Sequence, residues 1–181
     1  HLDWELWRHG VDVPFSPDFV PFKWRGWTMF GTGALGDMAC HILDPLWFAF
    51  EPGMPDWVEG EAKVASEFSF PETAVVRFHF PAKDGRPEFL LTFWSGKGIR
   101  PPAPRNLGPG LGQPDNGTIF YGSRETVMAD SHASNIGIIP AIRAEEMKGS
   151  LPAPSLPRIR GPHRRLASLA RDPAWLEGPP V

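Results

Sequence analysis

The segment that decides the fold is residues 31–44, which read GTGALGDMACHILD. Its first six residues fit the pattern G-x-G-x-x-G of a dinucleotide-binding loop, but such a loop directly follows a buried β-strand. Residues 22–30 (FKWRGWTMF) contain two charged side chains and a glycine instead of a β-branched run. The acidic residues near the expected later position, Glu51 and Asp56, lie among the turn residues 52–55. We therefore do not interpret these glycines as a cofactor loop.

Helical spacing gives a better interpretation of the same segment. A helix would place Asp37, His41 and Asp44 on one side, because residues three or four apart share a face. The other side is apolar enough to pack against a sheet. It comprises Met38, Ile42, Leu46 and Phe50, with Leu35 and Leu43 nearby. Pro45 has no N–H and crowds the carbonyl of His41, so we expect a kink at Asp44-Pro45.

The pair Asp37 and His41 is a candidate for acid–base chemistry. A carboxylate one turn before an imidazole can fix its tautomer and raise its basicity, so that His41 could take a proton from a substrate hydroxyl. The alternative is an exposed i, i+4 pair without catalytic use. Arg25 also has two interpretations, which are contact with substrate oxygens or a salt bridge to Asp37 or Asp44 that fixes the loop.

Several blocks of the sequence resemble the second domain of the glucose-fructose oxidoreductase/inositol dehydrogenase/MocA family of predicted dehydrogenases. The most specific blocks are WRGW (24–27), FGTGALGDM (30–38) and HILDP (41–45). The opening LDWELW and the two strand-like segments TAVVRF and LTFW resemble that domain as well. The similarity runs from about Leu2 to about Arg158.

The resemblance implies the substrate-binding half of an NAD- or NADP-dependent oxidoreductase that acts on a sugar or polyol hydroxyl. It implies an α+β fold, with an open, mostly antiparallel β-sheet and helices on one face. A preceding Rossmann domain would bind most of the cofactor. Asp37 and His41 match the family residues beside the nicotinamide, with His41 as the general base. The expected substrate contacts are Lys23, Arg25, Trp27 and Asp44.

The chain begins at His1 without the Rossmann domain, its glycine loop or the family's catalytic lysine, and the resemblance fades beyond Pro157. We therefore expect a fragment that is inactive by itself. Because the N-terminal part is expected to be absent, the sequence indicates no localisation. Residues 1–157 would form the substrate-binding domain, and residues 158–181 a divergent tail rich in proline and arginine. A basic helix is expected over residues 163–171.

Composition excludes several classes of function. A net charge of −3 gives no electrostatic case for binding nucleic acid or an anionic membrane. The apolar runs are far shorter than the roughly 20 residues of a membrane-spanning helix. The single cysteine, Cys40, excludes an internal disulfide and a Cys-rich zinc site. We expect Cys40 to be a small apolar filler inside the helix.

Alternating side chains predict β-structure after residue 58. In residues 73–80, Val76, Phe78 and Phe80 share one face, and an antiparallel hairpin with residues 87–94 is expected. Two other β segments are expected, namely a strand over residues 62–70 and a hairpin over 117–130 that turns at Gly122-Ser123. Residues 96–117, with six glycines and five prolines, should form a long loop. Lys97 and Arg100 are weak site candidates in that loop.

Two other functions stay open. Asp37 and His41, joined by His9 or His132, could hold a metal in a hydrolase or lyase acting on carbohydrate, although no compact His-x-x-x-His or cysteine pair fixes the geometry. The chain could instead be a non-catalytic module that forms homo-oligomers through an open sheet face supplied by residues 76–80. The dehydrogenase interpretation requires that His41 borders a hollow that solvent can reach.

Overall fold

A computed structural model describes residues 1–64, 66–108, 112–133 and 135–153. The chain divides into two compact units, His1–Glu145 and Glu146–Val181. The second unit, described as far as residue 153, contains the end of helix α4 (Ala141–Met147), where the Ser150 amide donates to the Met147 carbonyl at 2.9 Å. The predicted tail, its basic helix and the domain boundary at residue 157 lie outside the described residues. The elements below belong to the first unit.

Aromatic rings, more than regular structure, hold the first 32 residues together. This segment contains the short helix α1 (Trp4–Trp7) and the 3-10 helix η1 (Lys23–Gly26). Phe19 is buried, and its ring centroid lies 5.1 Å from that of Trp27 and 5.3 Å from that of Phe30. Edge-on contacts of this kind add to the large apolar area that each ring removes from water. The rings therefore form a small separate core that anchors η1 next to α2.

Two helices, α2 (Gly33–Ile42) and α3 (Asp44–Phe50), follow and are separated at Leu43. The predicted kink is confirmed, because Pro45 lies in the first turn of α3 and cannot donate to the carbonyl of His41. On the predicted apolar side, Leu46 is buried and three residues are half-buried, whereas Leu35 and Phe50 are exposed. The half-buried residues are Met38, Ile42 and Leu43.

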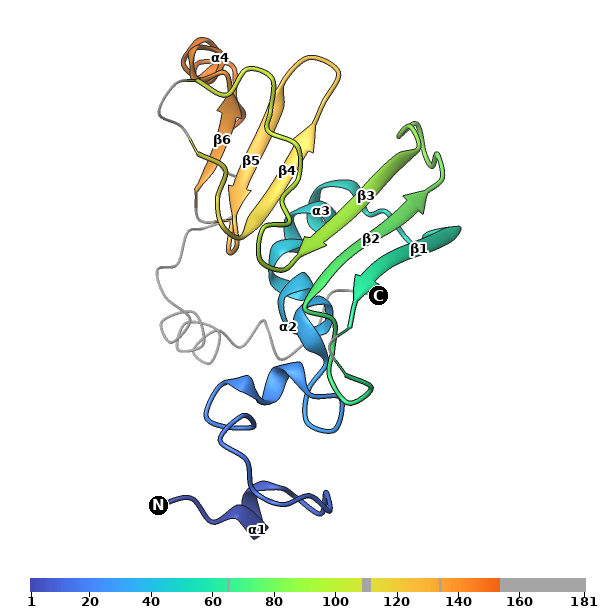
Figure 1. Cartoon of the computed structure of the whole chain (residues 1–181). Coiled ribbons are helices and arrows are strands. Elements are labelled where there is room, and N and C mark those ends of the chain that lie inside the picture. The colour runs from blue at the N-terminus through green and yellow to red at the C-terminus, as the bar shows by residue number, and fades with distance from the viewer. Residues whose placement is uncertain (65, 109–111, 134, 154–181) are drawn as a thin grey trace, which may run out of the picture. The chain divides into compact units, whose positions relative to one another are not determined.

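The first sheet contains β1 (Trp57–Lys63), β2 (Thr73–Phe80) and β3 (Phe89–Ser95), in that order and antiparallel (Figure 1). The hairpin predicted between the last two strands is confirmed, since Phe80 pairs with Phe89 and Ala74 with Ser95. This register brings the apolar residues of both strands to the same face.

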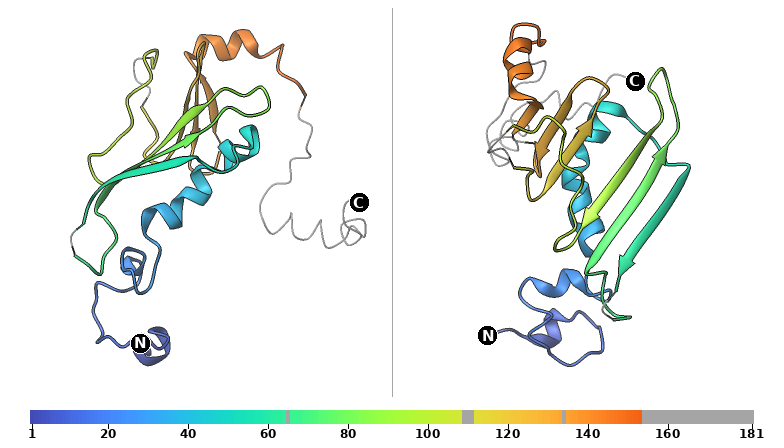
Figure 2. Two further views of the ribbon diagram at one scale, coloured as in Figure 1. Left: turned by 90° about the vertical axis from the view of Figure 1, so that its right-hand side faces the viewer. Right: turned by 45° about the horizontal axis from the view of Figure 1, so that its top comes forward.

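The apolar face of this sheet lies against α2 and α3 (Figure 2). Phe80 is fully buried, and its ring meets Trp47 of α3 edge-on at a centroid distance of 5.8 Å. Phe93 on β3 is also buried. Of the three residues expected to supply an open face for association, Phe80 is covered by Trp47 of α3, while Val76 and Phe78 are half-buried. Association through this sheet stays a prediction. The open face carries the alternate residues of β2, among them His79.

The strand predicted over residues 62–70 is misplaced, because β1 occupies Trp57–Lys63 instead. After β1 the chain turns through side-chain hydrogen bonds, with the Ser66 amide donating to Ser69 Oγ at 3.2 Å. Serine hydroxyls of this kind compete with the ladder of a strand. The Phe70 amide then donates to the carbonyl of Gly26 at 2.8 Å, so this segment joins η1 and not the sheet edge.

The second sheet contains β4 (Gly117–Tyr121), β5 (Thr126–Asp130) and β6 (Ile136–Ile139), again antiparallel and in chain order. The predicted hairpin is confirmed, and the Gly122 amide closes its turn by donating to the Glu125 carbonyl at 3.0 Å. Neither β6 nor α4 was expected from the sequence.

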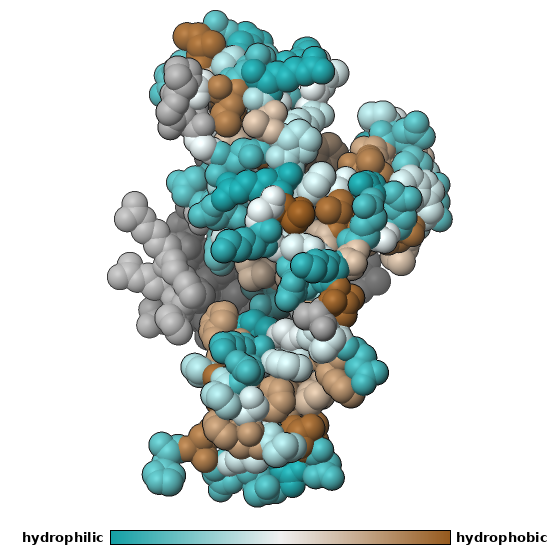
Figure 3. Space-filling model, in the orientation of Figure 1, coloured by the Kyte–Doolittle hydropathy of each residue, from teal (hydrophilic) through white to brown (hydrophobic). Residues whose placement is uncertain are grey.

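The loop between β3 and β4 separates the two sheets. Its described residues contain no helix or strand, as predicted from their proline and glycine content. The α+β class and antiparallel pairing are confirmed, but the described residues form two three-stranded sheets and not one open sheet. Over the face shown in Figure 3, hydrophobic residues are scattered among hydrophilic ones. Each helix in the described part of the chain is too short or too polar to cross a bilayer.

Candidate functional site

The three glycines at the start of α2 are used for packing within the chain. A Cβ at Gly31 would lie 2.6 Å from the carbonyl oxygen of Arg25, and one at Gly33 would lie 2.5 Å from the ring of Phe70. A Cβ at Gly36 would be equally close to Thr32. Within residues 1–32, all of them described, no strand precedes these glycines. This geometry differs from the strand, turn and helix of a dinucleotide loop.

Asp37, in the middle of α2, forms a salt bridge with Arg25 of η1. The Nε of Arg25 donates to Asp37 Oδ2 at 3.0 Å, and both side chains are about one-third exposed, at 31% and 35%. The guanidinium also lies over two rings, 3.9 Å from the centroid of Phe22 and 4.5 Å from that of Trp24. Of the two interpretations of Arg25, the salt bridge to Asp37 is thus present.

His41 lies one turn after Asp37 and is exposed. No hydrogen bond or ion pair joins the two residues in the described part of the chain, because the carboxylate of Asp37 is directed to Arg25. The expectation that Asp37 steadies the imidazole directly is therefore not met. Asp37 instead fixes the position of α2 relative to η1, and the imidazole of His41 is left available to a ligand.

His132 is the side chain that the fold brings to His41. The two ring centroids are 5.9 Å apart and the ring planes are inclined by 33°. His132 follows β5, and its Nδ1 lies 2.8 Å from the hydroxyl oxygen of Ser131. From the sequence, His132 was expected only as an alternative metal ligand, because nothing in the spacing of these two histidines indicates that they meet.

Two residues close to His41 in sequence, Ile42 and Asp44, each line a cavity. Asp44 borders a cavity of 440 Å³ whose walls are almost entirely apolar. They include Phe48, Phe50, Phe120, Val127 and Ile136. Ile42 borders a cavity of 340 Å³ with more polar walls, among them Arg100, Gln113 and Tyr121. His41 itself lines neither of these cavities. The hollow that the dehydrogenase interpretation requires is therefore bordered by Ile42 and Asp44 and not by the imidazole of His41.

The other predicted substrate contacts, Lys23 and Trp27, are both directed to Asp18. Lys23 Nζ lies 2.6 Å from the Asp18 carboxylate, and the indole nitrogen of Trp27 donates to the Asp18 carbonyl at 2.9 Å. The structure therefore brings together Arg25 with Asp37, and His41 with His132. It does not bring Lys23 or Trp27 into hydrogen-bond contact with either pair among the described residues.

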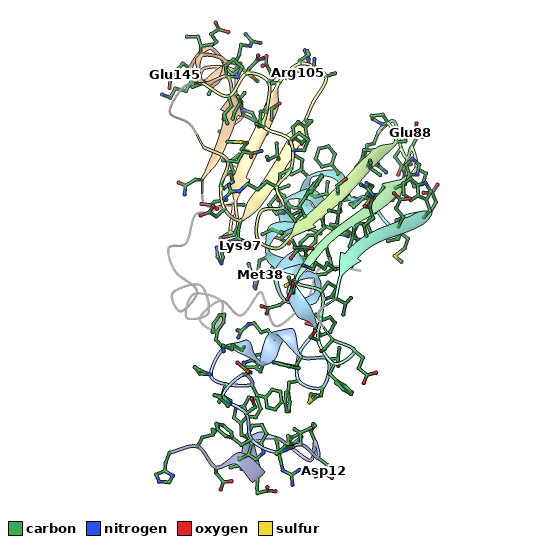
Figure 4. All side chains as sticks on the ribbon, viewed as in Figure 1. Asp12, Met38, Glu88, Lys97, Arg105 and Glu145 are labelled. Carbon is green, nitrogen blue, oxygen red and sulfur yellow. The ribbon has the colours of Figure 1, made fainter. Side chains whose placement is uncertain are left out.

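Three further sequence expectations can be compared with the structure. Cys40 is exposed and its thiol donates weakly to the Asp37 carbonyl at 3.3 Å, so the prediction of an interior filler is wrong. Arg100 pairs with Asp115 at 2.6 Å, while Lys97 lies in the loop after β3 (Figure 4). For the metal alternative, the described residues contain no group of three His, Cys, Asp or Glu side chains placed to hold an ion.

A second aspartate–histidine pair, missed by the sequence analysis, lies at the end of the first sheet. His79 Nδ1 lies 2.6 Å from Asp56 Oδ1, and its Nε2 lies 3.6 Å from a carboxylate oxygen of Glu88. The imidazole stacks on Trp57 with nearly parallel planes, 1° apart. The hydrogen bond from His79 lowers the pKa of the Asp56 carboxyl below its ordinary value of 3.8. The pairing of β1 with β2 places Trp57 opposite His79 and so brings the preceding residue, Asp56, next to the imidazole. A local sequence motif therefore does not predict this contact.

Burial and hydrogen bonding shift two other groups. Burial raises the pKa of the Tyr121 phenol, whose hydroxyl donates to the Pro102 carbonyl beside the 340 Å³ cavity. The Arg77 guanidinium donates to Glu61 at 2.8 Å and to Glu59 at 2.9 Å, which raises its pKa. Both glutamates lie on the neighbouring strand β1, so Arg77 cross-links the open face of the sheet. Neither group lies in hydrogen-bond contact with His41.

Comparison with known proteins adds no assignment. No protein-family model matches this chain, and no curated protein gives a significant match to it.

Proposed function

We propose that this chain is the substrate-binding half of an NAD- or NADP-dependent oxidoreductase that acts on a sugar or polyol hydroxyl, with His41 as the general base. The observation that carries the proposal is the position of His41. Its imidazole is exposed at the end of α2, donates no hydrogen bond to Asp37 in the described part of the chain, and is next in sequence to residues that border two cavities. Among the described residues no hydrogen bond to the imidazole of His41 is present, and a free proton acceptor is what a hydroxyl substrate needs.

The roles of the neighbouring residues follow from their contacts. Arg25 and Asp37 hold η1 against α2 and so position the helix that carries His41. Asp44, whose carboxylate has no hydrogen bond within the described residues, can accept from a second hydroxyl of the substrate. Lys23 and Trp27 act on the substrate less directly, because Asp18 holds both side chains.

Charge and exposure on this side of α2 suit a nicotinamide supplied by another domain. The exposed imidazole of His41, the Asp37 carboxylate paired with Arg25 and the Asp44 carboxylate make this side of the helix polar. A nicotinamide supplied by another domain would provide the acceptor for the hydride of the carbinol carbon. His41 takes the hydroxyl proton in the same reaction, and the carbon–oxygen single bond becomes a carbonyl.

The experiment compares His41→Ala with His9→Asn in the whole gene product that contains these residues. Reduction of NAD⁺ and NADP⁺ is followed with myo-inositol, glucose and xylose as substrates. Loss of a general base lowers kcat by about 10²- to 10⁴-fold, so His41→Ala should fall by that factor. His9 is exposed and adopts a φ of 48°, which asparagine tolerates, so its variant should retain the wild-type rate. Wild-type activity in His41→Ala, or no reduction with any polyol, would overturn the proposal.

A further inference from the structure

The turn that follows β5 holds His132 in a defined position. Two groups donate to the carboxylate of Asp130, namely the His132 amide at 3.2 Å and Asn135 Nδ2 at 2.6 Å. The Ala133 amide also donates to the Asp130 carbonyl at 3.0 Å, and Ala133 itself has a φ of 50°. A non-glycine residue in the left-handed region is held there by its surroundings. These hydrogen bonds fix the backbone of the turn that carries His132, whose side chain is exposed.

Ser131 contacts one of the two ring nitrogens of His132 and so bears on its tautomer. The hydroxyl of Ser131 lies 2.8 Å from Nδ1. If this hydroxyl donates, Nδ1 is the acceptor and Nε2 carries the proton. His132 then presents an N–H donor, whereas the neutral His41 presents an acceptor. The two imidazoles would thus be complementary to one hydroxyl group, which donates one hydrogen bond and accepts another.

The separation of the rings suits such a shared oxygen. With centroids 5.9 Å apart and planes inclined by 33°, the rings are too far apart to stack closely. Two N···O hydrogen bonds of about 2.7–3.2 Å each can meet on one oxygen between them. Asp44 and Ala133, close in sequence to the two histidines, both border the apolar 440 Å³ cavity. Neither histidine lines that cavity, whose walls begin at these two neighbours in sequence.

We propose that His132 is a second catalytic residue of the His41 site, whose Nε2–H donates to the same substrate oxygen that His41 deprotonates. This inference rests on the proposed function. The hydroxyl proton goes to His41 and the hydride of the carbinol carbon to the oxidised nicotinamide, so the oxygen carries developing negative charge before it becomes a carbonyl oxygen. A donor aimed at that oxygen stabilises the charge, as in an oxyanion hole.

The kinetic test uses His132→Ala, His132→Gln and the control His9→Asn in the same gene product, with the best of the three polyols. Removal of one oxyanion donor costs about 10²- to 10³-fold in kcat, so His132→Ala should lose that much. His132→Gln restores an N–H donor and should recover at least tenfold of the loss. If His41→Ala is inactive while His132→Ala stays within twofold of wild type, the role of His132 is wrong and the proposed function stands. If His41→Ala is fully active, the proposed function fails first.

A second measurement does not depend on the folding of a variant. Nitrogen-15 NMR of the unaltered 181-residue chain reports which imidazole nitrogen is protonated in each histidine. The proposal requires the Nε2–H tautomer at His132, with a change in its Nε2 shift on addition of myo-inositol. Ser131→Ala should weaken the preference for this tautomer. The Nδ1–H tautomer at His132 in the wild-type chain would overturn the inference.

Discussion

The two aspartate–histidine pairs of this protein differ in how they are built. On α2, Asp37 and His41 are one helical turn apart, yet the carboxylate contacts Arg25 and the imidazole stays exposed. In the first sheet, Asp56 and His79 are 23 residues apart, yet they are joined at 2.6 Å.

The comparison shows that helical spacing and strand pairing bring two side chains together in different ways. Helical spacing puts two side chains on one face, but a third residue can still take one of them. Strand pairing sets the position of the backbone itself, and the Asp56 amide donates to the His79 carbonyl at 3.0 Å next to the side-chain contact. The pair in the sheet is therefore committed to structure, whereas the pair on the helix leaves an imidazole available for chemistry.

The largest effect on stability is expected beside the sheet pair. Phe80 follows His79 and is fully buried between Trp47 and Phe89, with centroid distances of 5.8 Å and 4.9 Å. Phe80→Ala should lower the free energy of unfolding by about 3–5 kcal/mol through the cavity it leaves. Urea unfolding followed by circular dichroism measures the change. Phe48→Ala, at a side chain that is 77% exposed, is the control and should change it by less than about 0.5 kcal/mol. Equal effects would show that the core does not lie under this strand.

The second prediction concerns pH and distinguishes the two pairs directly. Because the folded pKa of Asp56 is lowered, its ionised form stabilises the fold at pH values above the ordinary 3.8, and this contribution is lost as pH falls through the lowered pKa. Asp56→Asn should therefore destabilise the protein at pH 6, with a difference from wild type that shrinks below pH 3.8. Unfolding curves across that range measure it.

Asp84→Asn is the control for this experiment. Asp84 lies in the turn before β3 with a φ of 50°, a conformation that asparagine tolerates, and its side chain is 87% exposed. The free energy of unfolding should stay nearly unchanged in that variant. A difference between wild type and Asp56→Asn that does not vary with pH would contradict the contact with His79.

The smallest effect is expected for the helix pair and decides which partner Asp37 has. A double-mutant cycle of Arg25→Gln and Asp37→Asn should give a coupling of about 0.2–1 kcal/mol, because both side chains are partly exposed. The coupling should decrease at 1 M salt. A parallel cycle of Asp37→Asn with His41→Ala should give a smaller value. The reverse order would mean that Asp37 steadies His41 after all.

Local patterns in the sequence correctly predicted the structural features that depend on residues adjacent in the chain. The break at Pro45, the hairpin that pairs Phe80 with Phe89 and the turn at Gly122 all follow from a few adjacent residues. The strand expected over residues 62–70 was misplaced because serine hydroxyls and the backbone of η1 took its hydrogen bonds. Side-chain competition of this kind is not visible in alternation alone.

The site was predictable in part for the same reason. His41 and Asp44 could be placed on one side of the helix from spacing, and Arg25 was considered as a partner of Asp37. The approach of His132 could not be foreseen, because it depends on a turn 91 residues further along the chain than His41. Contacts between distant segments are fixed by tertiary packing, which the spacing of residues within one segment does not encode.

The outer edge of β1 has a consequence for self-association. Among the described residues β1 is the outermost strand of its sheet, and all seven of its residues are exposed, so its outer backbone groups offer a template for an incoming chain. Glu59, Glu61 and Lys63 place a charge at every second position along this template, and Arg77 holds both glutamates in place. An approaching strand would have to strip water from those charges, which makes edge-to-edge aggregation costly at the most accessible border of the sheet.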